Sequence, residues 1–449
     1  MCAGYDPIGE YKQKTKKSAE WFQTASKHLP GGVTGNVKFY PPYPVYLKKA
    51  KGSHVWDLDG NEYIDYMLCF GPLILGHGHP KVLEAVSRQL KEDGTQILGA
   101  PHELEAVMAE RLKRIFPFAD AVRFTNSGLE ATLHALRVAR GAKKKARFAK
   151  FEGAYHGCYD EALVSLAPAL EFAGPESSPQ TVSGSFGTSH SAIQNVQILP
   201  FNDIENTERI LRAHRDDLAA VIMEPVQRGF VVPDLEFLKV VRETTRELGI
   251  VLIFDEVMSG FRMEKFGGAS TTYGIDPDMI CLGKIIGGGF PCGAFMGKRE
   301  LMDMVNPATK PKEERVFHGG TFNGHPTVLA AGMATLDVLE EPRTYPYLNR
   351  ISDHLRNGFN DLFGRMGYEA EAIGPGSTFN IVFTKGRISD YRDVTKCDSK
   401  TRQKLDFGLM ARGMHLHPDK PFYTCTEHSE KDVDQTLKVA EEVLKKMKE

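Results

Sequence analysis

Lys284 stands where a lysine side chain could become reactive. It follows the apolar run at 279–283 and precedes a glycine run, in the sequence MICLGKIIGGGF. Burial disfavours the charged form of an amine, and the neutral amine is the nucleophile that Schiff-base chemistry requires. The same lysine could instead reach from a strand end into water. Both interpretations place it at the end of a strand.

Two further polar positions follow predicted strands. Asp255 ends the apolar run at 250–254, and a carboxylate at the carboxyl end of a parallel strand lies where open α/β sheets bind ligands. Ser127 and Gly128 stand where a strand gives way to a helix, and the free N–H groups and dipole of a helix start suit a phosphate. Asp255 and Ser127 could equally be ordinary helix caps.

An aromatic pair and a glycine-rich turn complete the candidates. Tyr155 and His156 follow the run at 147–151, and an aromatic ring there could stack on a planar cofactor or belong to the core. The turn HGGT at 318–321 could bind an anion or simply reverse the chain. Taken together, a lysine, a carboxylate, a phosphate-binding helix start and an aromatic ring match pyridoxal 5′-phosphate, which has an aldehyde, a pyridine nitrogen and a phosphate.

The elements that must position these residues can be expected from the pattern of apolar runs. Short runs rich in Val, Ile, Leu and Phe alternate with helical segments, which predicts βαβ units and a mainly parallel sheet covered on both faces. A hairpin is expected at 53–67 around Asp59-Gly60. The strands are predicted at 122–125, 147–151, 219–223, 250–254 and 279–283.

The two ends of the chain predict a second, smaller α+β domain. We expect a helix from about 11 to 29, helices at 344–366 and about 398–412, a strand at 377–383, and a last helix that Ser429 and Asp432 begin as a capping box. The segment 165–195, rich in Ser, Gly and Pro, is predicted to be a lid or binding loop. The expected division is 1–75 and 339–449 for the small domain and 76–338 for the large one.

Composition excludes several classes of protein. Of 449 residues, 41% are hydrophobic and 25% charged, and the net charge of −2 comes without a basic block, which argues against nucleic-acid binding. No apolar run approaches the roughly 18 residues of a membrane span, and the N-terminus has no apolar signal region. The seven cysteines show no metal-ligand spacing, so neither a metal nor disulfides are expected. These features predict a cytoplasmic enzyme.

Several motifs resemble those of the class III aminotransferases of fold type I, and within them the glutamate-1-semialdehyde 2,1-aminomutase branch. The interval of 29 residues from Asp255 to Lys284 fits that family. The matching segments are PGGV (30–33), GPLILGHGHP (71–80), NSGLEAT (126–132), FEGAYHG (151–157), EPV (224–226), DEVMSGFR (255–262), GKIIGGGFPCGAF (283–295) and HGGTFNGHP (318–326). The resemblance implies a large domain with a mainly parallel seven-stranded sheet and a smaller α+β domain.

The resemblance also implies roles for residues. Lys284 would form the Schiff base and move the proton, and Asp255 would pair with the pyridinium nitrogen. The remaining cofactor contacts would be Ser127 and Gly128 on the phosphate, Tyr155 on the ring face with His156 supporting it, and Leu129, Asn202, Glu224 and Val257 nearby. Thr321 would reach the phosphate of the neighbouring subunit, which implies a homodimer.

The sequence departs from the aminomutase branch where substrate would bind. Lys38 stands near the place of an arginine, and Tyr423 follows Phe422 where the branch has a glutamate. The aromatic loop 39–43 resembles that of relatives acting on aryl amino acids, so we predict Lys38, Tyr40 and Phe422 as substrate contacts.

The leading interpretation is a ping-pong aminotransferase acting between an amino acid, possibly bulky, aryl or β-amino, and a keto acid. The alternatives are the aminomutase itself, an amino-acid racemase or epimerase, and a non-catalytic protein of this fold. The last would be expected to lack the lysine or the aspartate, and Lys284 and Asp255 are both present.

Overall fold

The structure is a computed structural model that describes residues 5–449, and its contacts divide the chain into two units. The large unit comprises Pro80–Pro342 and Arg387–Thr395, and the small unit comprises residues 5–79 together with Arg343–Gly386 and Lys396–Glu449. Both divisions lie four residues after the predicted ones at 75/76 and 338/339. The short segment Arg387–Thr395 lies within the range predicted for the small domain, but it belongs to the large unit.

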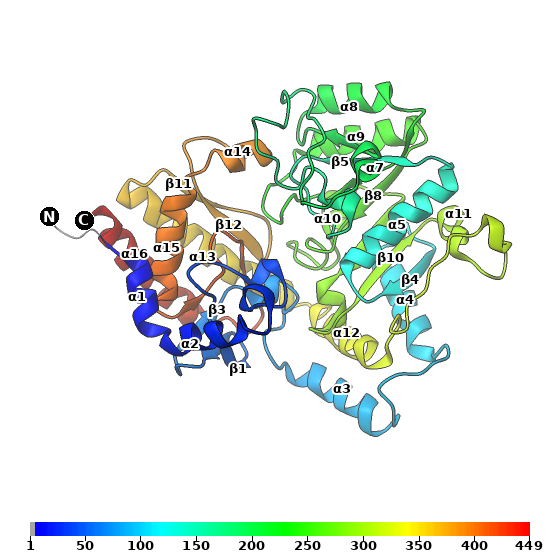
Figure 1. Ribbon diagram of the computed structural model, residues 1–449. Coiled ribbons are helices and arrows are strands. Elements are labelled where there is room, and N and C mark those ends of the chain that lie inside the picture. The colour runs from blue at the N-terminus through cyan, green and yellow to red at the C-terminus, as the bar shows by residue number, and fades with distance from the viewer. Residues whose placement is uncertain (1–4) are drawn as a thin grey trace. The chain divides into compact units, whose positions relative to one another are not determined.

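A seven-stranded sheet forms the centre of the large unit (Figure 1). Five neighbouring strands are parallel, and β10 runs antiparallel between β9 and β4. This confirms the predicted fold class. In sheet order the strands are β4 (Ala121–Thr125), β10 (Gly293–Gly297), β9 (Met279–Gly283), β8 (Val251–Asp255), β7 (Leu218–Met223), β5 (Arg147–Phe151) and β6 (Val196–Leu199).

Every residue of β7, β8 and β9 is buried, as expected for central strands covered on both faces. Helix α5 (Gly128–Lys143) packs across β4 and β7–β10. The other helices of this unit are α3 (Pro80–Lys91), α4 (Glu103–Ile115), α6 (Asp160–Leu163), α7 (His190–Gln194), α8 (Ile204–Ala213), α9 (Leu235–Glu247), α10 (Ala269–Tyr273), α11 (Arg299–Met302), α12 (Pro326–Leu339) and α14 (Tyr391–Thr395).

The small unit contains two sheets over one aromatic core. The first joins β1 (Leu47–Lys51), β2 (His54–Asp57), β3 (Glu62–Asp65) and β13 (Met414–His415), and its antiparallel β2–β3 pair is the predicted hairpin. The second joins β11 (Ala370–Ile373), β12 (Thr378–Phe383) and β14 (Phe422–Tyr423). Phe359, Phe379 and Phe422 pack together in the core between these elements and the helices.

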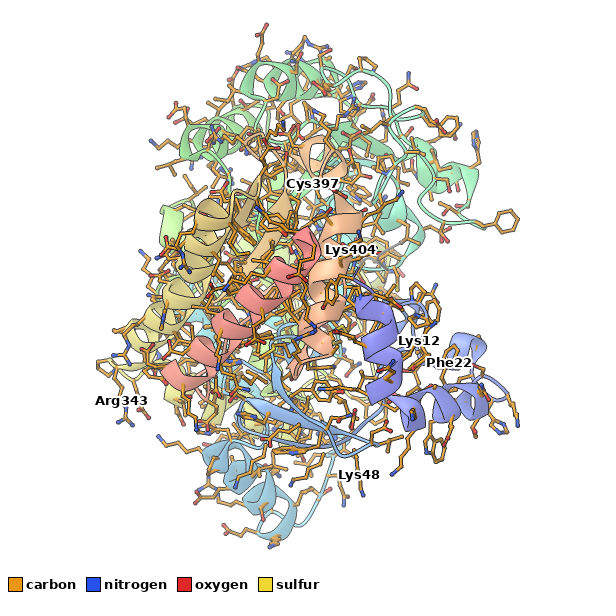
Figure 2. The ribbon with its side chains drawn as sticks, turned by 90° about the vertical axis from the view of Figure 1, so that its left-hand side faces the viewer. Lys12, Phe22, Lys48, Arg343, Cys397 and Lys404 are labelled. Carbon is orange, nitrogen blue, oxygen red and sulfur yellow. The ribbon has the colours of Figure 1, made fainter. Side chains whose placement is uncertain are left out.

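The helices of the small unit are α1 (Pro7–Lys14), α2 (Lys16–Ala25), α13 (Thr344–Met366), α15 (Ser399–Met410) and α16 (Glu430–Lys448). Figure 2 shows α1, which carries Lys12, beside α15, which carries Lys404. The single helix expected at 11–29 is two helices, because Thr15, with φ of −115° and ψ of 43°, leaves the helical conformation between them. Ser429 and Asp432 form the predicted capping box.

Residues 5–449 contain neither a membrane-spanning helix nor a cluster of metal ligands. None of the helices is long and apolar enough to cross a membrane. No group of three or more His, Cys, Asp or Glu side chains within this range is arranged to hold a metal ion.

Candidate active site

Four neighbouring parallel strands deliver polar residues to one edge of the large sheet. Asp255 is the last residue of β8, Lys284 follows β9, and Glu224 follows β7. Tyr155 and His156 lie in the turn after β5. Because the carboxyl ends of parallel strands meet at the same edge, the βαβ order brings together residues that are up to 129 positions apart.

Asp255 is buried and held by two donors. His156 Nδ1 donates to its Oδ2 at 2.8 Å, and the backbone N–H of Val257 donates to its Oδ1 at 3.0 Å. Burial lowers the pKa of His156, against the opposing effect of the Asp255 carboxylate, so the imidazole is a neutral donor at physiological pH. The pair fixes the aspartate carboxylate at the edge of the sheet.

Lys284 adopts a left-handed backbone conformation, with φ of +44°. This conformation costs a non-glycine residue roughly 1–2 kcal/mol, and such strain concentrates at functional sites. Burial lowers the pKa of Lys284, while the negative charges of Asp255 and Glu224 act in the opposite direction. The shift increases the fraction of neutral, nucleophilic amine.

The Glu224 carboxylate is bonded to the backbone of Tyr155 by a hydrogen bond. Glu224 is 7% exposed and accepts a hydrogen bond from the Tyr155 N–H at 2.9 Å. Burial, followed by the charge of Asp255, raises the pKa of Glu224 to about 7. The Tyr155 side chain is 45% exposed, so it is not a core residue and its ring is open to a ligand.

The N-terminus of α5 approaches this group closely. Ser127 is the helix N-cap, and its Oγ accepts from Glu130 N at 3.2 Å. A Cβ atom at Gly128 would lie 2.6 Å from Val257 Cγ1, and one at Gly283 would lie 3.2 Å from the Gly128 Cα. Glycine is therefore required where the helix start meets the strand ends.

Leu129 lies beside the turn that carries the aromatic pair. A Cβ atom at Gly157 would lie 2.8 Å from Leu129 Cγ. The helix start with its free N–H groups is thus placed between the turn at 155–157 and the segment after Asp255, where it can bind an anion.

Two predicted cofactor contacts have other surroundings. The Asn202 amide donates to the carbonyls of Ser389 at 2.8 Å and Val232 at 3.2 Å, and its oxygen accepts from Asp234 N at 2.9 Å. Thr321 is exposed on a turn. Their contacts with a cofactor stay predictions.

The predicted substrate contacts belong to the small unit. Lys38 is exposed, and its Nζ donates to Thr34 Oγ1 at 2.9 Å. Tyr40 is 6% and Phe422 1% exposed, and Phe422 stacks on Phe379 with ring centroids 5.1 Å apart. The burial of Tyr40 and Phe422 speaks against direct substrate contact, because both rings form part of the core of this unit.

Sequence reasoning did not single out Lys150, Arg228 or Arg392 in the large unit, of which Lys150 and Arg392 are buried and Arg228 is half-buried. The Lys150 amine donates to the carbonyls of Ala154, Ala162 and Val164 at 2.7–2.9 Å. A lysine inside the apolar run RFAKF was the available signal. The arginines gave none, because their partners are distant in sequence.

Comparison with known proteins identifies the family. A family model described as Aminotransferase class-III matches residues 37–385, which is more than half of the chain. The chain belongs to the class III aminotransferases. This class III aminotransferase is 40% identical over 441 residues to the glutamate-1-semialdehyde 2,1-aminomutase of Thermodesulfovibrio yellowstonii, covering 97% of this chain and 100% of the relative. The enzyme of the same name from Thermus thermophilus is 39% identical over 435 residues, with 95% and 98% covered.

Solved structures show the same fold. An omega-transaminase from Sphaerobacter thermophilus superposes with a TM-score of 0.91 at 36% identity, covering 96% of this aminotransferase and 98% of that chain. A transaminase with PLP bound superposes with a TM-score of 0.87 at 29% identity, covering 97% and 98%. A glutamate-1-semialdehyde aminomutase from Pseudomonas aeruginosa superposes with a TM-score of 0.87 at 24% identity, covering 98% of this aminotransferase and 97% of that chain. At this identity the similarity shows the fold alone.

Pyridoxal 5′-phosphate is the cofactor of this class III aminotransferase. The residues present fit it: an amine with a lowered pKa at Lys284, a buried carboxylate at Asp255, an open aromatic ring at Tyr155, and a helix start where Gly128 leaves no space for a Cβ atom. Each chemical group of the cofactor therefore has a partner of the right kind at one sheet edge.

Proposed function

We propose that the chain moves an amino group between an amino acid and a keto acid, with Lys284 as the catalytic base and acid. The observation that supports this most directly is the position of Lys284, whose amine has a lowered pKa next to the charges of Asp255 and Glu224. Pyridoxal phosphate, when bound, supplies an aldehyde that condenses with amines and a ring that withdraws electrons from the substrate carbon. The residues of the chain hold and orient the cofactor and move the proton.

Each side chain has one task in this proposal. The Asp255 carboxylate, fixed by His156, keeps a proton on the ring nitrogen. Tyr155 covers one ring face, and Ser127 with Gly128 holds the phosphate at the start of α5. Neutral Lys284 Nζ takes a proton from the amino-bearing carbon of the substrate and returns it on the other side of the C–N unit.

We also propose a homodimer in which Thr321 reaches the neighbouring subunit's phosphate. Two aromatic rings flank this exposed turn, Phe317 at 77% and Phe322 at 58% exposure, and large exposed rings close together are typical of protein interfaces. Sedimentation equilibrium of the purified protein tests this, and a monomer at micromolar concentration contradicts it.

The finer assignment has two candidates, supported by different observations. The curated relatives are named glutamate-1-semialdehyde 2,1-aminomutase at 39–40% identity over nearly the whole chain, and these names favour the aminomutase over our leading interpretation. The similarity to the Sphaerobacter thermophilus omega-transaminase favours transfer between two molecules.

The residues near the predicted substrate end also favour transfer between two molecules. Lys38 presents a point charge where the aminomutase branch has the planar fork of an arginine. Tyr423, which is 3% exposed and lies in β14, stands in the position of its glutamate. We therefore place the aminotransferase first and the aminomutase second.

A half-reaction separates the two. Holoenzyme is mixed with one amino acid at a time (alanine, glutamate, phenylglycine or β-phenylalanine) without an acceptor, while the cofactor absorption and the released keto acid are followed. We expect the absorption to change with about one keto product per site. A matched Lys284→Ala variant must give no turnover.

Glutamate-1-semialdehyde is the second arm. Its conversion to 5-aminolevulinate with no half-reaction on any amino acid would assign the chain to the aminomutases and refute the leading proposal. Conversion of one enantiomer of an amino acid into the other, without keto acid release, would instead assign a racemase.

A further inference from the structure

Helix α14 carries a buried arginine that pairs with Glu152, in the turn that carries Tyr155 and His156. Arg392 is 6% exposed. Its Nε donates to Glu152 Oε2 at 2.7 Å and its Nη2 to Glu152 Oε1 at 3.0 Å. This two-pronged, charge-assisted pair has defined geometry, which a lysine could not reproduce.

The same guanidinium also holds the start of the 165–195 segment. Arg392 Nη1 donates to the Gly174 carbonyl at 2.9 Å, and Nη2 donates to that of Ala173 at 3.2 Å. One side chain thus links the turn after β5 to the loop that was expected to be a lid. This part of the loop is fixed by a buried charge.

The neighbouring tyrosine contacts the same turn. Gly153 has φ of +79°, and a Cβ atom there would lie 2.5 Å from the Tyr391 side chain, so the ring lies directly on the backbone. Tyr391 Oη donates to the Pro168 carbonyl at 2.9 Å. Arg228 lies over the Tyr391 ring, 5.0 Å from its centroid, and donates to the Gly153 carbonyl at 3.0 Å.

Glu152 and Gly153 lead directly into the two residues that meet the cofactor. Only Ala154 separates Gly153 from Tyr155. We propose that Tyr391 and Arg392 are positioning residues that hold the 152–156 turn so that Tyr155 and His156 meet the cofactor ring in the correct place. This inference rests on the role proposed above for Tyr155.

The test measures the affinity of apoenzyme for pyridoxal phosphate, by titration, and the visible spectrum of the loaded protein. We expect Arg392→Met to weaken cofactor binding about ten- to a hundredfold and to shift the spectrum, because displaced Tyr155 and His156 would lose part of their contact with the ring and each tenfold corresponds to only about 1.4 kcal/mol. Arg392→Lys should restore only part of the affinity. The matched control is Arg387→Met in the same segment, whose pair with Asp234 is exposed, and its affinity should stay within about twofold.

A double-mutant cycle separates positioning from a general loss of structure. Arg392→Met in a Tyr155→Leu background should cause little further loss of affinity, because the positioned ring is already gone. Fully additive losses would overturn the inference, as would wild-type affinity and spectrum in Arg392→Met. If Arg392→Met does not fold, Arg392→Lys and Glu152→Gln carry the same cycle.

The outcomes also distinguish this inference from the role on which it rests. Unchanged affinity in Tyr155→Leu alone would refute the ring contact of Tyr155. A loss in Tyr155→Leu with none in Arg392→Met would refute only the positioning role. Neither readout depends on which amino acid the enzyme converts.

Discussion

The raised pKa of Glu224 makes the stability of the apoenzyme depend on pH in a definite direction. An unfolded glutamate titrates near 4.5, whereas burial and the charge of Asp255 raise the pKa of Glu224 to about 7 in the folded chain. Between these values the folded state binds more protons than the unfolded state. The contribution of Glu224 is therefore present below the lower value and is lost as the pH rises to about 7.

The magnitude follows from the size of the shift. A change from 4.5 to about 7 at roughly 1.4 kcal/mol per pH unit is on the order of 3 kcal/mol. Glu224→Gln removes the titrating group, and its amide oxygen can still accept from the Tyr155 N–H. The variant should therefore gain stability relative to wild type by roughly that amount between about pH 4 and pH 8.

Urea unfolding of both apoproteins at about pH 4 and pH 8 measures this difference. Glu247→Gln is the control, because Glu247 is paired with Arg212 on the surface and its pKa is lowered, so the variant should show no such gain as the pH rises. If the stability difference between Glu224→Gln and wild type is the same at both pH values, burial and the charge of Asp255 do not raise the pKa of this carboxyl, and the reasoning fails.

Two packing predictions use denaturation midpoints as the measurement. Gly128→Ala should destabilise the protein by about 1–3 kcal/mol and weaken cofactor binding, since the new Cβ would lie 2.6 Å from Val257 Cγ1. The control is Gly364→Ala in α13, where a Cβ atom meets nothing within 4 Å, and it should stabilise the protein by about 0.5–1 kcal/mol. Equal effects at both glycines would refute the packing argument. Lys150→Met should destabilise the protein by about 3 kcal/mol or more, because three buried carbonyls lose their donor. The control Lys145→Met, nearer the surface, should destabilise it less. A larger loss of stability in Lys145→Met would contradict this.

The parts of the fold that could be predicted are those in which the local pattern and the tertiary environment agree. The runs that became β5, β7, β8 and β9 are apolar because both faces of the sheet are covered, and Asp255 and Lys284 stood out as the polar residues that end such runs. β10 contains two glycines in five residues, GAFMG, and left no comparable signal. Thr15 leaves the helical conformation between α1 and α2, and the composition around it does not reveal this break.

Residues that act through distant partners were beyond sequence reasoning. Arg392 meets Glu152 across 240 positions, and nothing around either residue marks the pair. Tyr40 and Phe422 show the opposite error. The family resemblance suggested both as substrate contacts, but the three-dimensional packing encloses both rings in the core of the small unit.

The left-handed backbone of Lys284 has a consequence for any attempt to improve this protein by selection. Glycine adopts φ of +44° without the steric penalty, and asparagine tolerates it better than lysine does. Replacing the lysine would therefore relieve strain while removing the amine, which is the trade between stability and activity seen at many working sites. Screening a library for heat resistance alone would therefore favour variants with glycine at position 284, and these most stable variants would be inactive.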